Sequence, residues 1–182
     1  MILSLLLTVV LCQQPSNPGK PIDTPPPDMD YFLGTWSFEW NMPDSPLGPG
    51  GKIKGTETYS KIMNGAAYES QTDGEGPEGR LQIRAITSYD KARKQVSRYE
   101  VYSDGLSILK TGPIGGDLGG YYTVYWEATP INKDGHVIKL KGKTLMRSPA
   151  SYRVELQISA DGGPYTSLGN PWFQKQDTAP SK

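Results

Sequence analysis

Residues 31–36, which read Tyr-Phe-Leu-Gly-Thr-Trp, decide the fold class of this chain. They stand where a proline-rich stretch ends and a long series of strand-like segments begins. Gly34 permits a tight entry into the first strand, because glycine adopts backbone angles that other residues avoid. Trp36 carries a large apolar ring that can plug one end of a small antiparallel barrel. The stretch predicts a β-barrel in which Gly34 and Trp36 are structural residues.

Strand-like segments recur after residue 33 at the spacing of about ten residues that is typical of all-β barrels and sandwiches. We expect strands over residues 34–41, 52–63, 66–72, 80–89, 95–102, 106–111, 121–129, 136–146, 151–159 and 165–174. The expected hairpin turns are Asn64-Gly65, Asp73-Gly74, Asp104-Gly105, Asp134-Gly135 and Asp161-Gly162-Gly163. Such pairs supply the positive backbone angles of tight hairpins. About ten strands joined in this way must split into two sheets or close, and we predict closure into an antiparallel up-and-down barrel.

Apolar and polar side chains alternate along several of these strands. Leu81 and Ile83 share one face while Gln82 and Arg84 share the other, and residues 151–159 follow the same rule. A slip of one residue would expose the apolar row to water, so the register is well specified. Residues 121–129 carry aromatic side chains on both faces, and we expect that strand to be covered on both sides.

The composition predicts one all-β domain and argues against nucleic-acid binding. The 182 residues include 21 Gly, 16 Pro, 11 Tyr and 4 Trp, which favours many short strands. Residues 31–182 carry 18 Lys and Arg against 16 Asp and Glu, so the net charge of +2 gives no basic field for nucleic acid. The single cysteine, Cys12, lies before the strands, so we expect neither disulfides nor cysteine zinc sites among them.

The first 28 residues indicate export. Residues 2–11 form an apolar run that is too short for a spanning helix of about 20 residues but matches the centre of a signal segment, although no Lys or Arg precedes it. We assign residues 1–12 to export, either through lipid attachment at Cys12 or through ordinary cleavage. Leu11 departs from the small residue usual before a lipidated cysteine. A buried N-terminal strand is the alternative.

Residues 13–28 contain six prolines and are expected to form an extended linker. Asp28 is available to cap one short helical turn before the first strand. The barrel is expected over residues 29–176 and a disordered tail over residues 177–182. This organisation predicts a periplasmic or extracellular protein whose only membrane tether would be its N-terminus.

Catalytic signatures are missing from the sequence. It holds no nucleophile elbow, P-loop, dinucleotide fingerprint or zinc-protease motif. The one histidine, His136, follows the Asp134-Gly135 turn, and we expect it to face solvent rather than to ligate haem or act as a base. We predict no catalytic residue, no metal site and no cofactor.

The glycine-rich run at residues 112–120 is the most unusual segment after the linker. A phosphate cradle would need a helix behind it, whereas Tyr121 begins an expected strand. We therefore expect a mobile connection at the barrel mouth, which is compatible with gating of a cavity.

Three arginines lie in the middle of expected strands, where lysine or threonine is the common outer-face choice. An arginine that points into a barrel can bind a ligand carboxylate through two hydrogen bonds, with tyrosine hydroxyls beside it. The candidate ligand-binding residues are Arg84, Arg98, Arg153, Tyr59, Tyr68, Tyr99, Tyr125 and Trp126. The alternatives are cross-strand ion pairs and an arginine stacked on Trp36 at the closed end.

The order and spacing of several short motifs resemble a bacterial family of unknown function with a lipocalin-like (calycin-like) barrel. The matching pieces are Leu33-Gly34-Thr35-Trp36, the loop at residues 46–51, Gly55-Thr56-Glu57, the Asn64-Gly65 turn before Tyr68-Glu69, and Ser88-Tyr89-Asp90. The resemblance covers roughly residues 31 to 175 and departs at residues 112–126. It implies the fold and small-molecule binding, and it transfers no catalytic residue.

We therefore expect an exported barrel that binds a small apolar or amphiphilic ligand in its interior. One alternative is an isomerase or hydrolase that uses a pocket carboxylate from among Glu39, Glu57, Glu69, Glu100, Glu127 and Glu155. Another is a non-catalytic surface interaction module with a filled core. An interior cavity of about 300 Å³ or more distinguishes a binding barrel from a filled one. The sequence leaves the oligomeric state open.

Overall fold

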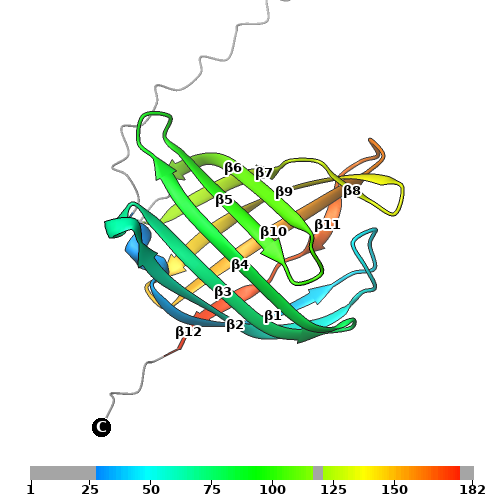
Figure 1. Cartoon of the computed structure of the whole chain (residues 1–182), viewed down its shortest axis with the longest axis horizontal. Coiled ribbons are helices and arrows are strands. Elements are labelled where there is room, and N and C mark those ends of the chain that lie inside the picture. Colours follow the sequence, from blue (N-terminus) through cyan, green and yellow to red (C-terminus); the bar gives the residue numbers. More distant parts are fainter. Residues whose placement is uncertain (1–27, 117–120, 177–182) are drawn as a thin grey trace, which may run out of the picture.

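A closed antiparallel barrel of ten strands forms the body of the protein (Figure 1). The computed structural model describes residues 28–116 and 121–176. The expected signal segment, most of the linker, the tail and residues 117–120 of the glycine-rich run lie outside these residues. A one-turn 3-10 helix, η1 (Met29–Phe32), precedes the first strand, and the Asp28 carboxylate caps it by accepting from the Asp30 amide at 3.0 Å.

The strands follow one another as a meander. In chain order they are β1 (Gly34–Met42), β2 (Gly51–Ile62), β3 (Ala67–Gly76), β4 (Gly79–Asp90), β5 (Gln95–Tyr102), β6 (Ser107–Gly116), β7 (Tyr122–Ala128), β8 (Ile131–Lys133), β9 (His136–Ser148), β10 (Ser151–Ala160), β11 (Thr166–Gly169) and β12 (Trp172–Lys175), with a short 3-10 turn η2 (Met63–Gly65) between β2 and β3. β8 and β11 are short additions that pair only with β9 and β10. The prediction of an all-β, antiparallel up-and-down barrel of about ten strands is confirmed.

A four-residue strand closes the ring. β12 pairs with β1 over Trp36–Glu39 on one side and with β10 over Ser151–Arg153 on the other. The expected strand over residues 165–174 is therefore two strands, β11 and β12. Pro171 lies between them, and because proline has no backbone N–H it cannot continue a hydrogen-bonded ladder.

Two other expectations from the sequence are wrong. Asp73-Gly74 is not a turn: β3 continues to Gly76, and Gly74 faces Gly55 of β2 across the ladder. A side chain on Gly74 would meet the Lys54 carbonyl oxygen at 2.7 Å, so glycine here permits a close approach of two strands rather than a reversal.

The described part of the glycine-rich run is not a loop. Gly112 to Gly116 belong to β6, and Gly115 and Gly116 pair with Thr123 and Tyr122 of β7. The β6–β7 ladder skips Gly112 and Pro113, which fits the missing N–H of proline.

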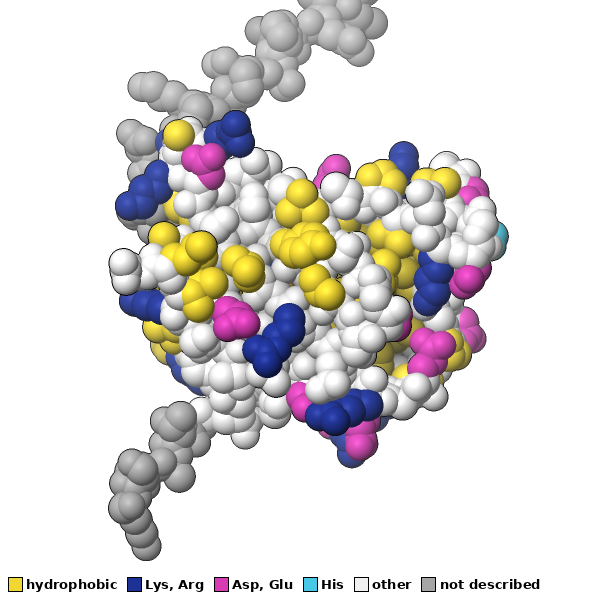
Figure 2. Space-filling view, in the orientation of Figure 1, with side chains coloured by type: hydrophobic (Ala, Val, Ile, Leu, Met, Phe, Trp, Pro, Cys, Tyr) yellow, Lys and Arg dark blue, Asp and Glu magenta, His cyan; other side chains and the backbone are white. Residues whose placement is uncertain are grey.

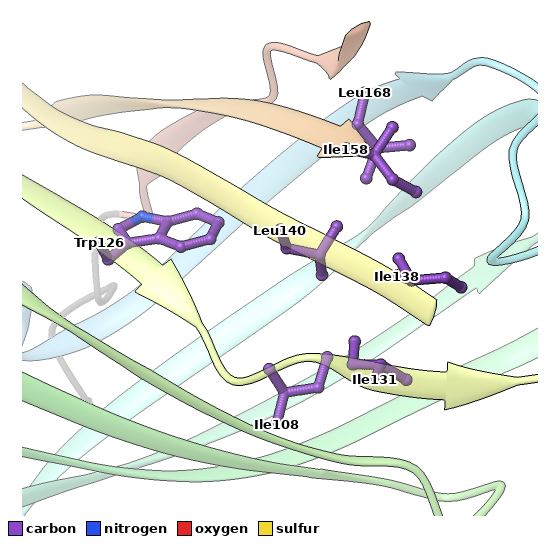
Figure 3. Packing of buried hydrophobic residues seen from close by; sticks show 7 residues of the cluster. All are labelled: Ile108, Trp126, Ile131, Ile138, Leu140, Ile158 and Leu168. Atoms are coloured by element: carbon purple, nitrogen blue, oxygen red, sulfur yellow. The ribbon is translucent and has the colours of Figure 1, made fainter. Parts of the chain in front are cut away.

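The interior is packed at both ends of the barrel. At one end, Trp36 is fully buried among Met29, Phe32, Met146 and Tyr152, and its indole N–H donates to the Phe32 carbonyl at 2.7 Å. At the other end, a second apolar cluster gathers side chains from β6 to β11 (Figure 3), namely Ile108, Trp126, Ile131, Ile138, Leu140, Ile158 and Leu168. The cation above the Trp36 ring is Lys175 of β12, 5.1 Å from the ring centroid, and not an arginine, which was an alternative expectation from the sequence.

Among residues 28–116 and 121–176, no helix has the length and apolar character needed to cross a bilayer.

Candidate functional site

A cavity of about 190 Å³ lies inside the barrel, bordered by residues of both apolar clusters. One part of its wall is apolar, with Leu81, Ile83, Val96, Val124 and Trp126 among its residues. Another part is polar and charged, and includes Glu57, Arg98, Glu100 and Lys110. The space-filling view shows the surface hollowed beside the β8–β9 hairpin, with hydrophobic side chains visible below the rim (Figure 2).

Arg98 of β5 is the centre of the polar wall. Its Nε donates to Glu100 Oε1 at 2.7 Å, and its terminal nitrogens donate to Glu57 Oε1 at 2.7 Å and to Ser70 Oγ at 3.1 Å. Further hydrogen bonds reach the Tyr59 hydroxyl at 3.1 Å and Thr87 Oγ1 at 3.3 Å. These partners come from β2, β3, β4 and β5, so the guanidinium ties four neighbouring strands together from the inside.

Lys110 and Tyr102 complete the environment of Glu100. The Lys110 ammonium lies 2.7 Å from Glu100 Oε2, and the Tyr102 hydroxyl donates to the same oxygen at 3.0 Å. Lys110 also lies over the Trp126 ring, 4.7 Å from its centroid. On the other side of Arg98, the Tyr152 hydroxyl donates to Glu57 Oε2 at 3.2 Å.

The electrostatics of the cluster keep Glu100 ionised. Burial by itself raises the pKa of Glu100, but Lys110 and Arg98 outweigh that effect and bring its pKa to about 2. Burial raises the pKa of Tyr59, Tyr102 and Tyr152, so these phenols stay protonated. Tyr102 and Tyr152 donate to the carboxylates, and the Tyr59 hydroxyl accepts from Arg98. The pKa of Arg98 is raised, because Tyr59, Glu57 and Glu100 outweigh the opposite effect of its burial.

The structure brings half of the expected ligand-binding residues to the cavity: Tyr59, Tyr68, Arg98 and Trp126. Tyr68 stands near the η1 end, where its hydroxyl donates to Asp30 at 2.6 Å, and Lys61 pairs with the same carboxylate at 2.6 Å.

The other four lie on the outer wall. Arg84 is exposed and pairs with Glu69 at 3.3 Å, and Arg153 pairs with Glu155 and stacks on Trp172 at 5.6 Å. Tyr99 and Tyr125 are 47% and 48% exposed. The strand at residues 121–129 was expected to be covered on both faces, and this expectation is wrong at Tyr125. The physical reason is parity: Arg84 and Arg153 are sequence neighbours of the inward-facing Ile83 and Val154, and successive side chains of a strand point to opposite faces.

An apolar row crosses the outer wall over β4, β5 and β6. Ile86, Tyr99 and Leu109 are direct cross-strand neighbours, and all three are exposed. Hydrophobic side chains are visible over these strands in the space-filling view (Figure 2).

His136 faces solvent, as the sequence predicted. Its Nδ1 lies 2.7 Å from the Asp161 carboxylate, which raises the pKa of the imidazole. Within residues 28–116 and 121–176, no group of three His, Cys, Asp or Glu side chains is placed to bind a metal ion.

Sequence reasoning did not single out Lys110, Tyr102 or Tyr152 for this site, and it named Glu57 and Glu100 only among scattered carboxylates. One signal was available for part of it: Arg98, Glu100 and Tyr102 share the face of Val96 by the period of two. Nothing in the sequence specified which neighbouring strands would supply their partners.

Comparison with one solved structure supports the fold, and two others are more distant. The crystal structure of Rv2717c from M. tuberculosis superposes with a TM-score of 0.65 at 10% identity, over 80% of this chain and 93% of that one. A designed fluorescence-activating β-barrel gives a TM-score of 0.44 at 18% identity, over 81% of this chain and 95% of that chain. The structure of EF1p2_mFAP2b bound to DFHBI gives a TM-score of 0.44 at 14% identity, with the same coverage of both chains. No family model and no curated protein matches the sequence, so the resemblance to a lipocalin-like bacterial family stays a prediction.

Proposed function

We propose that this barrel binds a small apolar or amphiphilic molecule, about the size of a single aromatic ring, in its interior cavity. The cavity carries the proposal: it joins an apolar wall to a polar, charged one inside a closed barrel. Concave, mostly apolar sites with a few placed polar groups are the usual form of small-molecule sites.

The volume sets the size of the ligand. At about 190 Å³ the cavity is smaller than the roughly 300 Å³ expected of a drug-sized pocket. It is larger than an engineered apolar cavity of about 150 Å³ that takes up benzene. A long fatty acid or a haem exceeds this space, and a single-ring compound fits it.

Binding is tested with toluene and the four tryptophan side chains as reporters. Trp40 and Trp126 line the cavity, whereas Trp172 is 45% exposed on the outer wall. Toluene should shift the indole N–H signals of Trp40 and Trp126 in a saturable manner in a ¹H–¹⁵N NMR titration, and it should leave that of Trp172 in place.

A matched pair of variants on β5 provides the control. Val96→Phe fills the cavity from the inside and should abolish the saturable shifts, at a stability loss of about 1–3 kcal/mol. Val101→Phe adds the same ring on the exposed face of the same strand and should bind toluene as the native protein does. Shifts that survive Val96→Phe, or that never saturate in the native protein, contradict interior binding.

An interaction module with a filled core is the second candidate, because the cavity of about 190 Å³ falls short of the roughly 300 Å³ that was expected to distinguish a binding barrel from a filled one. It would gain support if neither toluene nor any other single-ring compound gave saturable shifts. The enzyme alternative is less favoured. Glu57 and Glu100 are both buried, but Arg98 binds both, and an acid catalyst at neutral pH needs a raised pKa rather than the value of about 2 at Glu100.

A further inference from the structure

The donors of Arg98 are already used within the barrel. A guanidinium carries five N–H groups. In this structure they reach five acceptors: Glu100, Tyr59, Thr87, Glu57 and Ser70. A ligand carboxylate would have to displace one of these partners and leave it buried without its hydrogen bond.

The charges of the cavity wall are balanced before any ligand enters. Among the described residues, Arg98 and Lys110 line the cavity as cations, and Glu57 and Glu100 line it as anions. The side chains of the four are between 6% and 19% exposed. An anionic guest would add an uncompensated charge to this desolvated site, which is strongly unfavourable.

Lys110 and Glu100 retain hydrogen-bonding capacity. An ammonium has three donors, and Glu100 is the one acceptor that Lys110 contacts in residues 28–116 and 121–176. The carboxylate of Glu100 has about four lone-pair sites and receives Arg98, Tyr102 and Lys110. By this count Lys110 keeps two donors and Glu100 keeps one acceptor site, and the two groups lie side by side next to the Trp126 ring.

A hydroxyl group matches that pair, because it is both a donor and an acceptor. We propose that the cavity selects neutral, monohydroxylated single-ring aromatics of the phenol class, with the hydroxyl between Lys110 and Glu100 and the ring against the apolar wall near Trp126. This inference rests on the proposed interior binding and adds its chemical selectivity.

The test compares phenol, toluene and benzoate at pH 7 by the same NMR titration of the full chain. Phenol is neutral at this pH and benzoate is ionised. Phenol should bind at least about tenfold more tightly than either of the others, since one hydrogen bond to a charged group is worth about that factor. Equal affinity for toluene and phenol overturns the selectivity and leaves interior binding standing. Tightest binding of benzoate also overturns it. If none of the three compounds binds, both proposals fail.

A double variant locates the hydroxyl site. Lys110→Met combined with Glu100→Gln removes both charges together, so no unpaired ion is left behind. It should weaken phenol binding about tenfold and change toluene binding by less than about threefold. Lys143→Met, at an outer-wall lysine paired with Glu155 at 3.0 Å, is the matched control and should change neither. Unchanged phenol affinity in the double variant overturns the assignment.

Discussion

Trp36 shows how one residue joins several parts of the molecule. Its ring is fully buried, it contacts the Tyr152 ring at a centroid distance of 4.8 Å, and its indole N–H binds the carbonyl of Phe32 in η1. Lys175 covers the ring from β12. The side chain therefore links the turn before β1, the body of the barrel and the closing strand.

Replacement of Trp36 by alanine should lower the free energy of unfolding by about 3–5 kcal/mol, because a large buried ring leaves a cavity that the surroundings fill only in part. Urea unfolding at pH 7 measures this change. Trp172→Ala, at a 45% exposed indole, should lose less than about 1 kcal/mol. Equal losses in the two variants would show that Trp36 is not a structural plug.

At the scale of single residues, the features that depend only on neighbouring residues in the sequence were predictable. Gly34 has φ of +98° and begins β1, so the expectation of a special backbone entry matches its geometry. Arg98 was named as a candidate, but its partners Glu57, Tyr59 and Ser70 lie 28 to 41 residues away along the chain. No periodic pattern specifies which of them an arginine will contact.

The pairing of β2 with β3 illustrates what single elements require. Gly55 and Gly74 face each other in this ladder, at a position where the backbones leave no room for a side chain. Gly74→Ala should therefore destabilise the protein by about 1–3 kcal/mol through overpacking. Thermal and urea unfolding measure the loss, and Ser60→Ala, at an exposed position of β2, should stay within about 0.5 kcal/mol of the native protein. A stabilising effect of Gly74→Ala would refute the close approach.

Element boundaries were predictable where alternation and turn chemistry agreed. Asp134 and Gly135 have φ of 50° and 82° and form the expected tight turn between β8 and β9. Asp73-Gly74 has the same sequence as this turn, yet it lies within β3. Its glycine is needed there because a side chain would clash with the backbone of β2. A dipeptide does not reveal whether its glycine serves a turn or a close contact.

At the scale of the whole molecule, the buried charges make the free energy of unfolding depend on pH. The pKa of Glu100 falls from an ordinary 4.5 to about 2 in the folded protein. A carboxyl whose folded pKa is depressed stabilises the fold above its unfolded pKa, and that contribution disappears as the pH falls through the folded value. The window therefore runs from about pH 4.5 to about pH 2, and the contribution is about 3 kcal/mol.

Glu100→Gln should lack this part of the acid dependence. Urea unfolding between pH 7 and pH 2 should show the native protein losing more stability than the variant, so that the two curves converge at low pH. Glu155→Gln, at the outer-wall carboxylate paired with Lys143, should retain the acid loss due to Glu100. Parallel curves for the native protein and Glu100→Gln would exclude a depressed pKa at Glu100.

Closure of the barrel was predictable because about ten strands joined by tight turns have few other arrangements. The cavity volume was not, since it depends on how the side chains of all ten strands pack around the ring. Pro171, which divides the last expected strand, was visible in the sequence, but the position of β12 between β1 and β10 was not.

The closing strand β12 has a consequence for biosynthesis. Because Trp172–Lys175 supply the pairing that joins β1 to β10, a nascent chain cannot complete its ring until these residues have left the ribosome. Until then both margins of the sheet present unpaired backbone groups to other chains. Translation of this protein thus passes through an aggregation-prone stage that lasts until β12 has paired with β1 and β10.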